Sequence, residues 1–305
     1  MAMYMVKRVA AAVVTLFLVS TLTFFLMFLV PGGPFLAEKA PSAQTLAALE
    51  KKYGLDQPLH VQYGNYMKHL LKGDLGSSLK LRGREVNDII GDGFPVSARL
   101  GAVAILIAIL LGVPMGSVAA LNRGKWFDNF IMFIATLGIA VPGFVIATLL
   151  MYYFGVVFKL LPTLGLTSPQ HYILPVIALS FYPTAYISRL TRSSMLDVLG
   201  QDYMNTARAK GLSQFVSLFK HALRNAILPV VTYLGPLLAY VLTGSFVVEK
   251  IFTIPGLGSQ FISSITNRDY PLIMGTTIFL AFLIITMNVV VDIVYKIVDP
   301  RIKLN

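Results

Sequence analysis

The chain has 305 residues, of which 56% are hydrophobic and only 13% are charged, whereas ordinary soluble domains are roughly 25% charged. It contains no cysteine, which excludes disulfides and thiolate metal sites. The net charge of +11 does not indicate nucleic-acid binding, because no soluble module with a basic patch and base-stacking aromatic residues is recognisable. Composition predicts an integral membrane protein.

Six stretches carry no Asp, Glu, Lys or Arg, and each is about long enough as a helix to cross a ~30 Å hydrocarbon core. These stretches are residues 9–30, 100–121, 129–158, 172–188, 226–248 and 271–291. Because they are continuous apolar runs without period-2 alternation, they predict helices and not barrel strands. We therefore expect an all-α, polytopic protein with six transmembrane helices, in which the first stretch is an uncleaved anchor.

The distribution of Lys and Arg predicts the orientation of these spans, because short cytoplasmic loops are enriched in basic residues. If the N-terminus is inside, the short outer loops hold only Lys159, Lys250 and Arg268. The other basic residues near span ends then lie mostly inside, so both termini are expected in the cytoplasm. We expect residues 1–305 to form one membrane domain in the cell membrane, with an extracytoplasmic segment over residues 31–95.

The segment 31–95 is expected to contain two short amphipathic helices. Ser42 is a suitable N-cap for the first, and Gly54 is a suitable stop. The second is expected over residues 61–72, ending at Gly73. Such a cap fits two interpretations, a passive lid over the outer mouth or a docking surface for a soluble partner.

Prolines are frequent in the expected spans, and each one removes a backbone hydrogen bond and can kink a helix. Kinked spans are usual in proteins that open and close a path, but they also occur in static bundles. The prolines concerned are Pro114, Pro142, Pro175, Pro183, Pro229 and Pro236.

Between the fourth and fifth spans, a basic segment predicts a short helix followed by an interfacial one. Asp202 near the start and Lys210 near the end of the short helix suit the helix dipole, and Gly211 suits the position after its end. Residues 215–223 place apolar side chains on one face of the following helix. The small residues of the short helix suit a plug for a groove on another protein. A basic linker bound to anionic headgroups fits equally well.

This segment resembles the EAA loop of ABC-importer permeases, whose core is Glu-Ala-Ala, three residues, then Gly. Here Asn205 and Thr206 replace the Glu and the first Ala, and the loop continues "HALRNAILP". In chain order, "FLVPGGP", "GDLGSS", "RLTRSSMLDVLGQDYMNTARAKGL", "GLGSQFISSITNRDYP" and "NVVVDIVYKIVDPRI" also resemble the oligopeptide/dipeptide/nickel permease family. Across its whole length the chain is most similar to the B-type permease subunit of that family.

The resemblance implies a type I ABC importer permease fold and a role in ATP-driven uptake of oligopeptides or dipeptides. It implies as partners a homologous second permease, two cytoplasmic ATPase subunits and an extracytoplasmic peptide-binding protein. The loop 190–225 would then couple the ATPases to the spans. The coupling residues carried over are Asn205, Thr206, Ala207, Arg208, Ala209, Lys210, Gly211 and Leu212. A nickel-chelate permease of the same family is the alternative, and a lone secondary transporter or channel is the alternative from another class.

No catalytic, cofactor or metal site is expected in this chain. A phosphate-binding G-x-x-x-x-G-K-[ST] motif is absent, so ATP and magnesium are expected only in the partner ATPases. The four histidines form no i, i+4 pair. Asp292, with Asn288 one turn earlier, is an intramembrane polar pair, and it fits either an anchor to a neighbouring helix or a functional charge.

Overall fold

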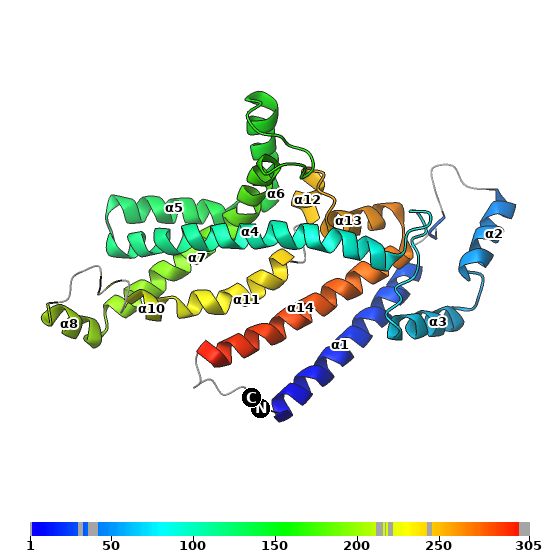
Figure 1. Cartoon of the computed structure of the whole chain (residues 1–305), viewed down its shortest axis with the longest axis horizontal. Coiled ribbons are helices and arrows are strands. Elements are labelled where there is room, and N and C mark those ends of the chain that lie inside the picture. Colours follow the sequence, from blue (N-terminus) through cyan, green and yellow to red (C-terminus); the bar gives the residue numbers. More distant parts are fainter. Residues whose placement is uncertain are drawn as a thin grey trace. The chain divides into compact units, whose positions relative to one another are not determined.

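The computed structural model describes residues 2–29, 33–35, 42–211, 216, 218, 222–242 and 246–298. Within this part the regular elements are helices, apart from one antiparallel bridge between Ser77 and Glu85. The all-α prediction is confirmed (Figure 1). The chain divides into two compact units, Met1–Val96 with Pro255–Ile285, and Ser97–Ile254 with Thr286–Asn305.

The first unit is built around an aromatic core. Its helices are α1 (Ala2–Leu29), α2 (Ala43–Tyr53), α3 (Leu59–Leu71), the start of α4 (Val86–Leu121), α13 (Leu257–Asn267) and most of α14 (Tyr270–Val298). Phe24 of α1 is buried, and its ring lies 5.3 Å from that of Tyr63 and 5.5 Å from that of Tyr66 on α3. Burial raises the pKa of the Tyr66 hydroxyl above its ordinary value. These contacts fix α3 against the end of α1.

The two short helices of segment 31–95 begin and end close to the predicted residues. Ser42 is the N-cap of α2 and accepts a 3.3 Å hydrogen bond from the Thr45 amide. Gly54 ends α2 in the left-handed conformation, with φ of 68°. The second helix, α3, begins at Leu59 instead of residue 61 and ends at Leu71, just before Gly73. Local capping chemistry thus accounts for both ends of α2 and, through Gly73 with its φ of 76°, for the end of α3, whereas the start of α3 has no side-chain cap.

Asp269 connects two distant parts of the first unit. Its carboxylate accepts a 3.0 Å hydrogen bond from the Leu79 amide and a second from the Ser78 hydroxyl. Ser78 and Asp269 are both buried. In the same segment, the Gly76 amide and then the His69 side chain lower the pKa of Asp74 by stabilising its carboxylate.

The second unit is organised around α7 (Gln170–Leu199). The remaining elements are α5 (Trp126–Ala140), α6 (Gly143–Leu150), the π-helical segment η1 (Met151–Val157), α8 (Asp202–Ala209), α10 (Leu223–Ala226), α11 (Leu228–Leu242) and α12 (Phe246–Ile251). Helices α5, α6, α10, α11 and α12 all pack on α7. Ile187 of α7 is fully buried in a core with Ala108 of α4 and Leu237 of α11.

Helix α4 approaches α7 closely because two of its residues are glycines. A Cβ at Gly112 would lie 2.8 Å from Cγ2 of Ile187, and one at Gly116 would lie 2.7 Å from Cβ of Thr191. Neither position has room for a side chain. Small residues at the crossing are how helices in membranes come into close contact.

Among the described residues, four helices are long and apolar enough to cross a membrane, Val6–Leu29, Val86–Leu121, Gln170–Leu199 and Tyr270–Val290. The expected third span is not one straight helix. It is broken between Ala140 and Gly143, where the helix axis bends by 101°. Within the expected fifth span the structure describes α11, which covers Leu228–Leu242, and the start of α12 at Phe246; residues 243–245 lie outside the described structure.

Among the span prolines, Pro142 lies at the break between α5 and α6, and Pro229 is the second residue of α11, just after α10 ends at Ala226. Pro142 is the N-cap of α6, and Val141 before it is extended, as the residue preceding a proline often is. Pro175 and Pro183 lie inside α7, and Pro236 lies inside α11, without ending either helix. Neighbouring helices tolerate such prolines where they pack tightly.

Candidate functional site

The short helix predicted in the basic segment is present as α8, and one methionine attaches it to the second unit. Met204 is 1% exposed and packs in a cluster with Ala120 at the end of α4 and Met195 of α7. Leu218, Ala222 and Ala226 complete this cluster. A force on α8 therefore acts directly on the ends of α4 and α7.

The surface of α8 away from Met204 is open. Thr206, Ala209, Lys210 and Gly211 are exposed. Gly211 has φ of 73°, as the predicted position after the helix end requires, and no described residue lies within 4 Å of the place where its Cβ would be. The start of α8 is held by a hydrogen bond of 2.9 Å, which the side-chain amide of Asn225 donates to the Tyr203 hydroxyl.

Several predicted site residues fall partly outside the described structure. Leu212 is not described, and for Asn205, Ala207 and Arg208 only the helical backbone is. Asn288 is an exposed residue of α14, while the side chain of Asp292, on the same helix, is not described. The roles of all these residues stay predictions.

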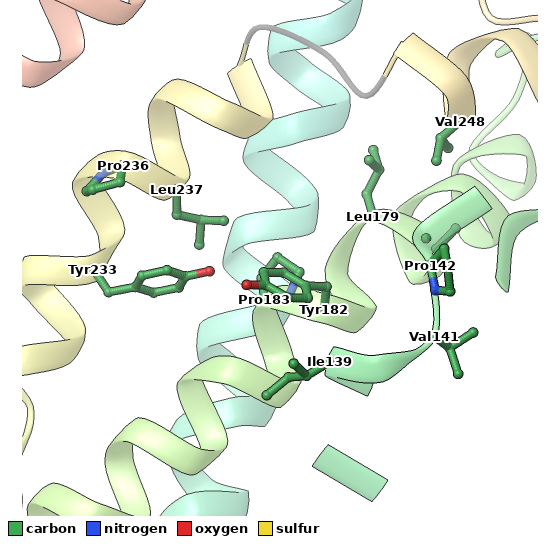
Figure 2. A pocket seen from close by; sticks show the side chains of 12 residues that line it. Ile139, Val141, Pro142, Leu179, Tyr182, Pro183, Tyr233, Pro236, Leu237 and Val248 are labelled. Atoms are coloured by element: carbon green, nitrogen blue, oxygen red, sulfur yellow. The ribbon is translucent and has the colours of Figure 1, made fainter. Parts of the chain in front are cut away.

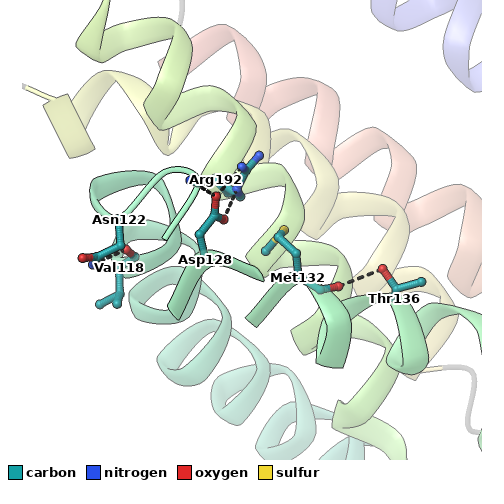
Figure 3. Close-up of polar contacts among 7 residues, drawn as sticks. Val118, Asn122, Asp128, Met132, Thr136 and Arg192 are labelled. Atoms are coloured by element: carbon teal, nitrogen blue, oxygen red, sulfur yellow. Dashed lines mark hydrogen bonds and ion pairs between the residues drawn. The ribbon is translucent and has the colours of Figure 1, made fainter. Parts of the chain in front are cut away.

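A buried ion pair joins the start of α5 to α7, and sequence reasoning missed it (Figure 3). Arg192 Nε and Nη2 donate hydrogen bonds of 2.5 and 2.7 Å to the two carboxylate oxygens of Asp128. The Gly124 amide adds a third donor at 2.9 Å. Asp128 is 2% exposed, so the pair fixes the α4–α5 turn to α7 shortly before α8 begins. The sequence offered one signal for this pair. Asp128 directly precedes the uncharged run 129–158, in a loop whose other charged residues, Arg123 and Lys125, are basic.

A second buried carboxylate, Glu249 on α12, was also missed. The Ser97 hydroxyl of α4 donates a 2.7 Å hydrogen bond to its Oε1, and Glu249 is fully buried. This contact holds α12 against α4. In the sequence Glu249 precedes Lys250, which suggests a solvated loop, so the burial could not be recognised locally.

A cavity of about 480 Å³ lies where α11, α7 and α12 meet the break between α5 and α6. Pro142, Pro183 and Pro236 all line it, and most of the other lining residues are aliphatic. Figure 2 shows Tyr233 of α11 and Tyr182 of α7 pointing toward one another across this space. The prolines of the three elements thus converge on one cavity, which the sequence pattern did not reveal.

A smaller cavity of about 370 Å³ adjoins the first and shares Ile139 and Tyr182 with it. It continues along α7 past Tyr186 to Arg189 and Ser193. The Tyr186 ring lies 4.2 Å from that of Tyr233, so the two cavities share one aromatic wall. Among the described residues, no group of three or more His, Asp or Glu side chains could hold a metal ion.

Comparison with known proteins gives matches over the whole chain. Residues 112–304 match the family model described as "Binding-protein-dependent transport system inner membrane component", and residues 1–101 match the corresponding N-terminal model. The chain is 50% identical to the dipeptide transport system permease protein DppB of Bacillus subtilis, over 100% of this chain and 99% of that protein. It is 43% identical to the oligopeptide transport system permease protein OppB of Haemophilus influenzae, over 98% and 99%.

Solved structures agree at the level of the fold. A chain of the inward-facing MetNI methionine ABC transporter matches with a TM-score of 0.56 and 16% identity, over 69% of this chain and 96% of that one. A chain of an amino acid ABC transporter matches with a TM-score of 0.53 and 19% identity, over 69% and 94%. The protein is thus a multi-pass membrane protein with the type I ABC importer permease fold. It belongs to the family of binding-protein-dependent transport system inner membrane components.

Proposed function

We propose that this chain is a permease subunit of an ABC importer that takes up dipeptides or oligopeptides. The observation that carries this proposal is full-length identity of 50% and 43% to permeases named for dipeptide and oligopeptide transport. In this proposal the chain pairs with a homologous permease. Two ATPase subunits supply ATP hydrolysis with their magnesium, and a separate binding protein delivers the peptide.

Helix α8 is the site we propose for ATPase docking. Met204 buries one side of the helix among residues of α4 and α7, while Thr206, Ala209 and Lys210 leave a small, exposed surface on the other. Small side chains allow the backbone of another protein to approach closely. Because α8 follows α7 directly, movement of a docked ATPase would be passed into the helix that organises the second unit. The proposed orientation, with both termini in the cytoplasm, places α8 on the ATPase side.

The transport proposal is tested with the complete complex in proteoliposomes, supplied with its binding protein and ATP. We expect ATP-dependent accumulation of a labelled dipeptide or tetrapeptide. Uptake of a nickel chelate without uptake of either peptide would support the nickel alternative and overturn the peptide assignment.

The docking proposal is tested by Ala209→Trp, which adds a bulky ring to the exposed surface of α8 without touching Met204. Ala48→Trp is the matched control, because Ala48 is an exposed alanine of another short helix, α2. A clash that removes about 2–3 kcal/mol of binding lowers affinity roughly 30- to 150-fold. We expect the Ala209→Trp permease to insert normally and to lose its ATPases on purification. If Ala209→Trp recovers as much ATPase as Ala48→Trp and uptake is normal, α8 is a linker and not the docking site.

A further inference from the structure

One face of α7 is polar and exposed although the helix is among those able to span a membrane. Tyr182, Tyr186, Arg189 and Ser193 are spaced four, three and four residues apart and are all exposed in the isolated chain. Residues at such spacings lie on one face of a helix. The opposite face carries the buried residues that pack on α4, α5 and α11.

Hydrocarbon is an unfavourable environment for this face. Ionisable and polar side chains within membrane spans almost always face a bundle interior or a water-filled cavity. The four residues meet that expectation, because they line the two adjoining cavities described above. From Tyr182 to Ser193 the face extends about 16 Å along the helix axis, at roughly 1.5 Å per residue. The two adjoining cavities, which share Ile139 and Tyr182, are together called the groove along α7, because their lining residues follow α7 from Ala178 to Ser193, toward α8.

The chemistry of this groove suits a peptide. Its tyrosine rings and aliphatic walls accept varied side chains. Pro183 and Leu179 both line the larger cavity, and Pro183 cannot donate the intrahelical hydrogen bond to the Leu179 carbonyl. Of the described residues that line the two cavities, Arg189 alone is charged.

We propose that this groove along α7 is the chain's part of the substrate path, and that Arg189 pairs with the carboxylate of the passing peptide while Tyr182 and Tyr186 contact its body. This inference rests on the proposed function and assigns residues to it. Among the described lining residues there is no Asp, Glu or His, and the one charge is positive. The groove therefore suits anionic or zwitterionic peptides and repels a bare divalent cation.

The first test uses the absence of natural cysteines in this chain. Tyr182→Cys and Ser193→Cys are introduced separately into the complete complex and exposed to a charged, membrane-impermeant thiol reagent. Leu106→Cys is the control, because Leu106 is 56% exposed on α4 and lines neither cavity. Complexes with the unaltered chain give the background from the other subunits.

We expect both α7 cysteines to react, more slowly during peptide transport, and Leu106→Cys to stay unlabelled. Ser193→Cys is nearly isosteric, so the test survives if Tyr182→Cys assembles poorly. If neither α7 cysteine reacts while the unaltered complex transports peptide, the face is covered by lipid or by the second permease. That result would overturn the assignment of the groove to the substrate path and leave the proposed function intact. If the unaltered complex moves no peptide, the proposed function fails instead.

The second test measures whether Arg189 recognises the carboxylate. Uptake of a dipeptide and of its C-terminal amide is compared in the unaltered complex and in Arg189→Gln and Arg189→Lys. All three use the same binding protein, so a change in the acid-to-amide ratio reports on the permease. Arg189→Gln removes the charged hydrogen bond to the peptide carboxylate. The ratio of dipeptide uptake to amide uptake should therefore fall about tenfold.

Arg189→Lys keeps the positive charge and should largely retain the ratio. Tyr182→Leu should lower uptake of both peptides, whereas the control Tyr152→Leu should not, because Tyr152 is an exposed tyrosine outside both cavities. An unchanged acid-to-amide ratio in Arg189→Gln would overturn the assigned role of Arg189.

Discussion

The ion pair between Asp128 and Arg192 should be the most sensitive polar contact of the second unit. Asp128→Ala removes both hydrogen bonds of 2.5 and 2.7 Å from the guanidinium, and also the acceptor of the Gly124 amide. It leaves Arg192 without its carboxylate in a place where Asp128 itself was 2% exposed. The α4–α5 turn then loses its polar contacts to α7, although α5 still packs on this helix.

The geometry sets the size of the effect. Removing one partner of a fully buried ion pair costs about 3–5 kcal/mol. The Arg192 side chain is 26% exposed, so water or headgroups can solvate it in part. We therefore expect a loss of about 2–3 kcal/mol, below the range for full burial. At roughly 2–4 °C per kcal/mol, the figure for chains of about 150–250 residues, the thermal midpoint should fall by roughly 4–12 °C.

The assay is thermal stability of the purified complex in detergent, followed by the fraction that remains monodisperse on size exclusion after heating. Asp92→Ala is the matched control, because Asp92 pairs with Arg84 at 2.5 Å but its side chain is 73% exposed. Breaking such an exposed pair costs about 0–1 kcal/mol. Asp128→Asn should fall between the two, since its amide oxygen can still accept from Gly124.

Equal midpoints for Asp128→Ala and Asp92→Ala would refute this reasoning. They would mean that solvent or lipid headgroups replace the carboxylate at no cost. A normal thermal midpoint in Asp128→Ala, with ATP hydrolysis that no longer drives transport, would also contradict the prediction. It would show that the ion pair acts in the conformational change and not in stability.

Three further outcomes are expected. Gly116→Ala should destabilise the protein by about 1–3 kcal/mol, because the added methyl overlaps α7; Gly64→Ala, on α3 with open space around it, should not lower the thermal midpoint. Ala48→Cys should react with an impermeant thiol reagent from outside and Ala209→Cys only from inside, and the reverse pattern would contradict the predicted orientation. If Asp292 anchors α14 by a hydrogen bond, Asp292→Asn should assemble and transport nearly normally while Asp292→Leu lowers yield; loss of transport in a well-assembled Asn variant would instead assign a function to the charge.

Burial in the folded chain decides which positions suit a labelling cysteine. From the sequence, Ser78 in the extracytoplasmic segment is a natural site for a labelling cysteine. In the folded chain Ser78 is 3% exposed and donates a hydrogen bond to Asp269. A cysteine there would report on burial and not on the side of the membrane, whereas Ala48 is exposed.

The sequence by itself determined the class and the local elements of this protein. Long uncharged runs must become helices in a membrane, because hydrocarbon offers no partner to an unpaired backbone group. Ser42, Gly54 and Gly211 marked helix ends correctly, because capping depends only on residues within one turn. The order of the loop motifs was likewise enough to indicate the family, which the full-length matches then showed.

Tertiary structure alone decided the contacts that bring distant residues together. Asp128 and Arg192 are 64 positions apart, and Ser97 and Glu249 are 152 apart. Nothing in either local pattern encodes the partner. The 101° break at Pro142 also depended on context, since Pro183 and Pro236 sit in helices that continue through them. A proline removes one hydrogen bond wherever it occurs, but packing against neighbouring helices decides whether the chain bends and whether the space left becomes a cavity.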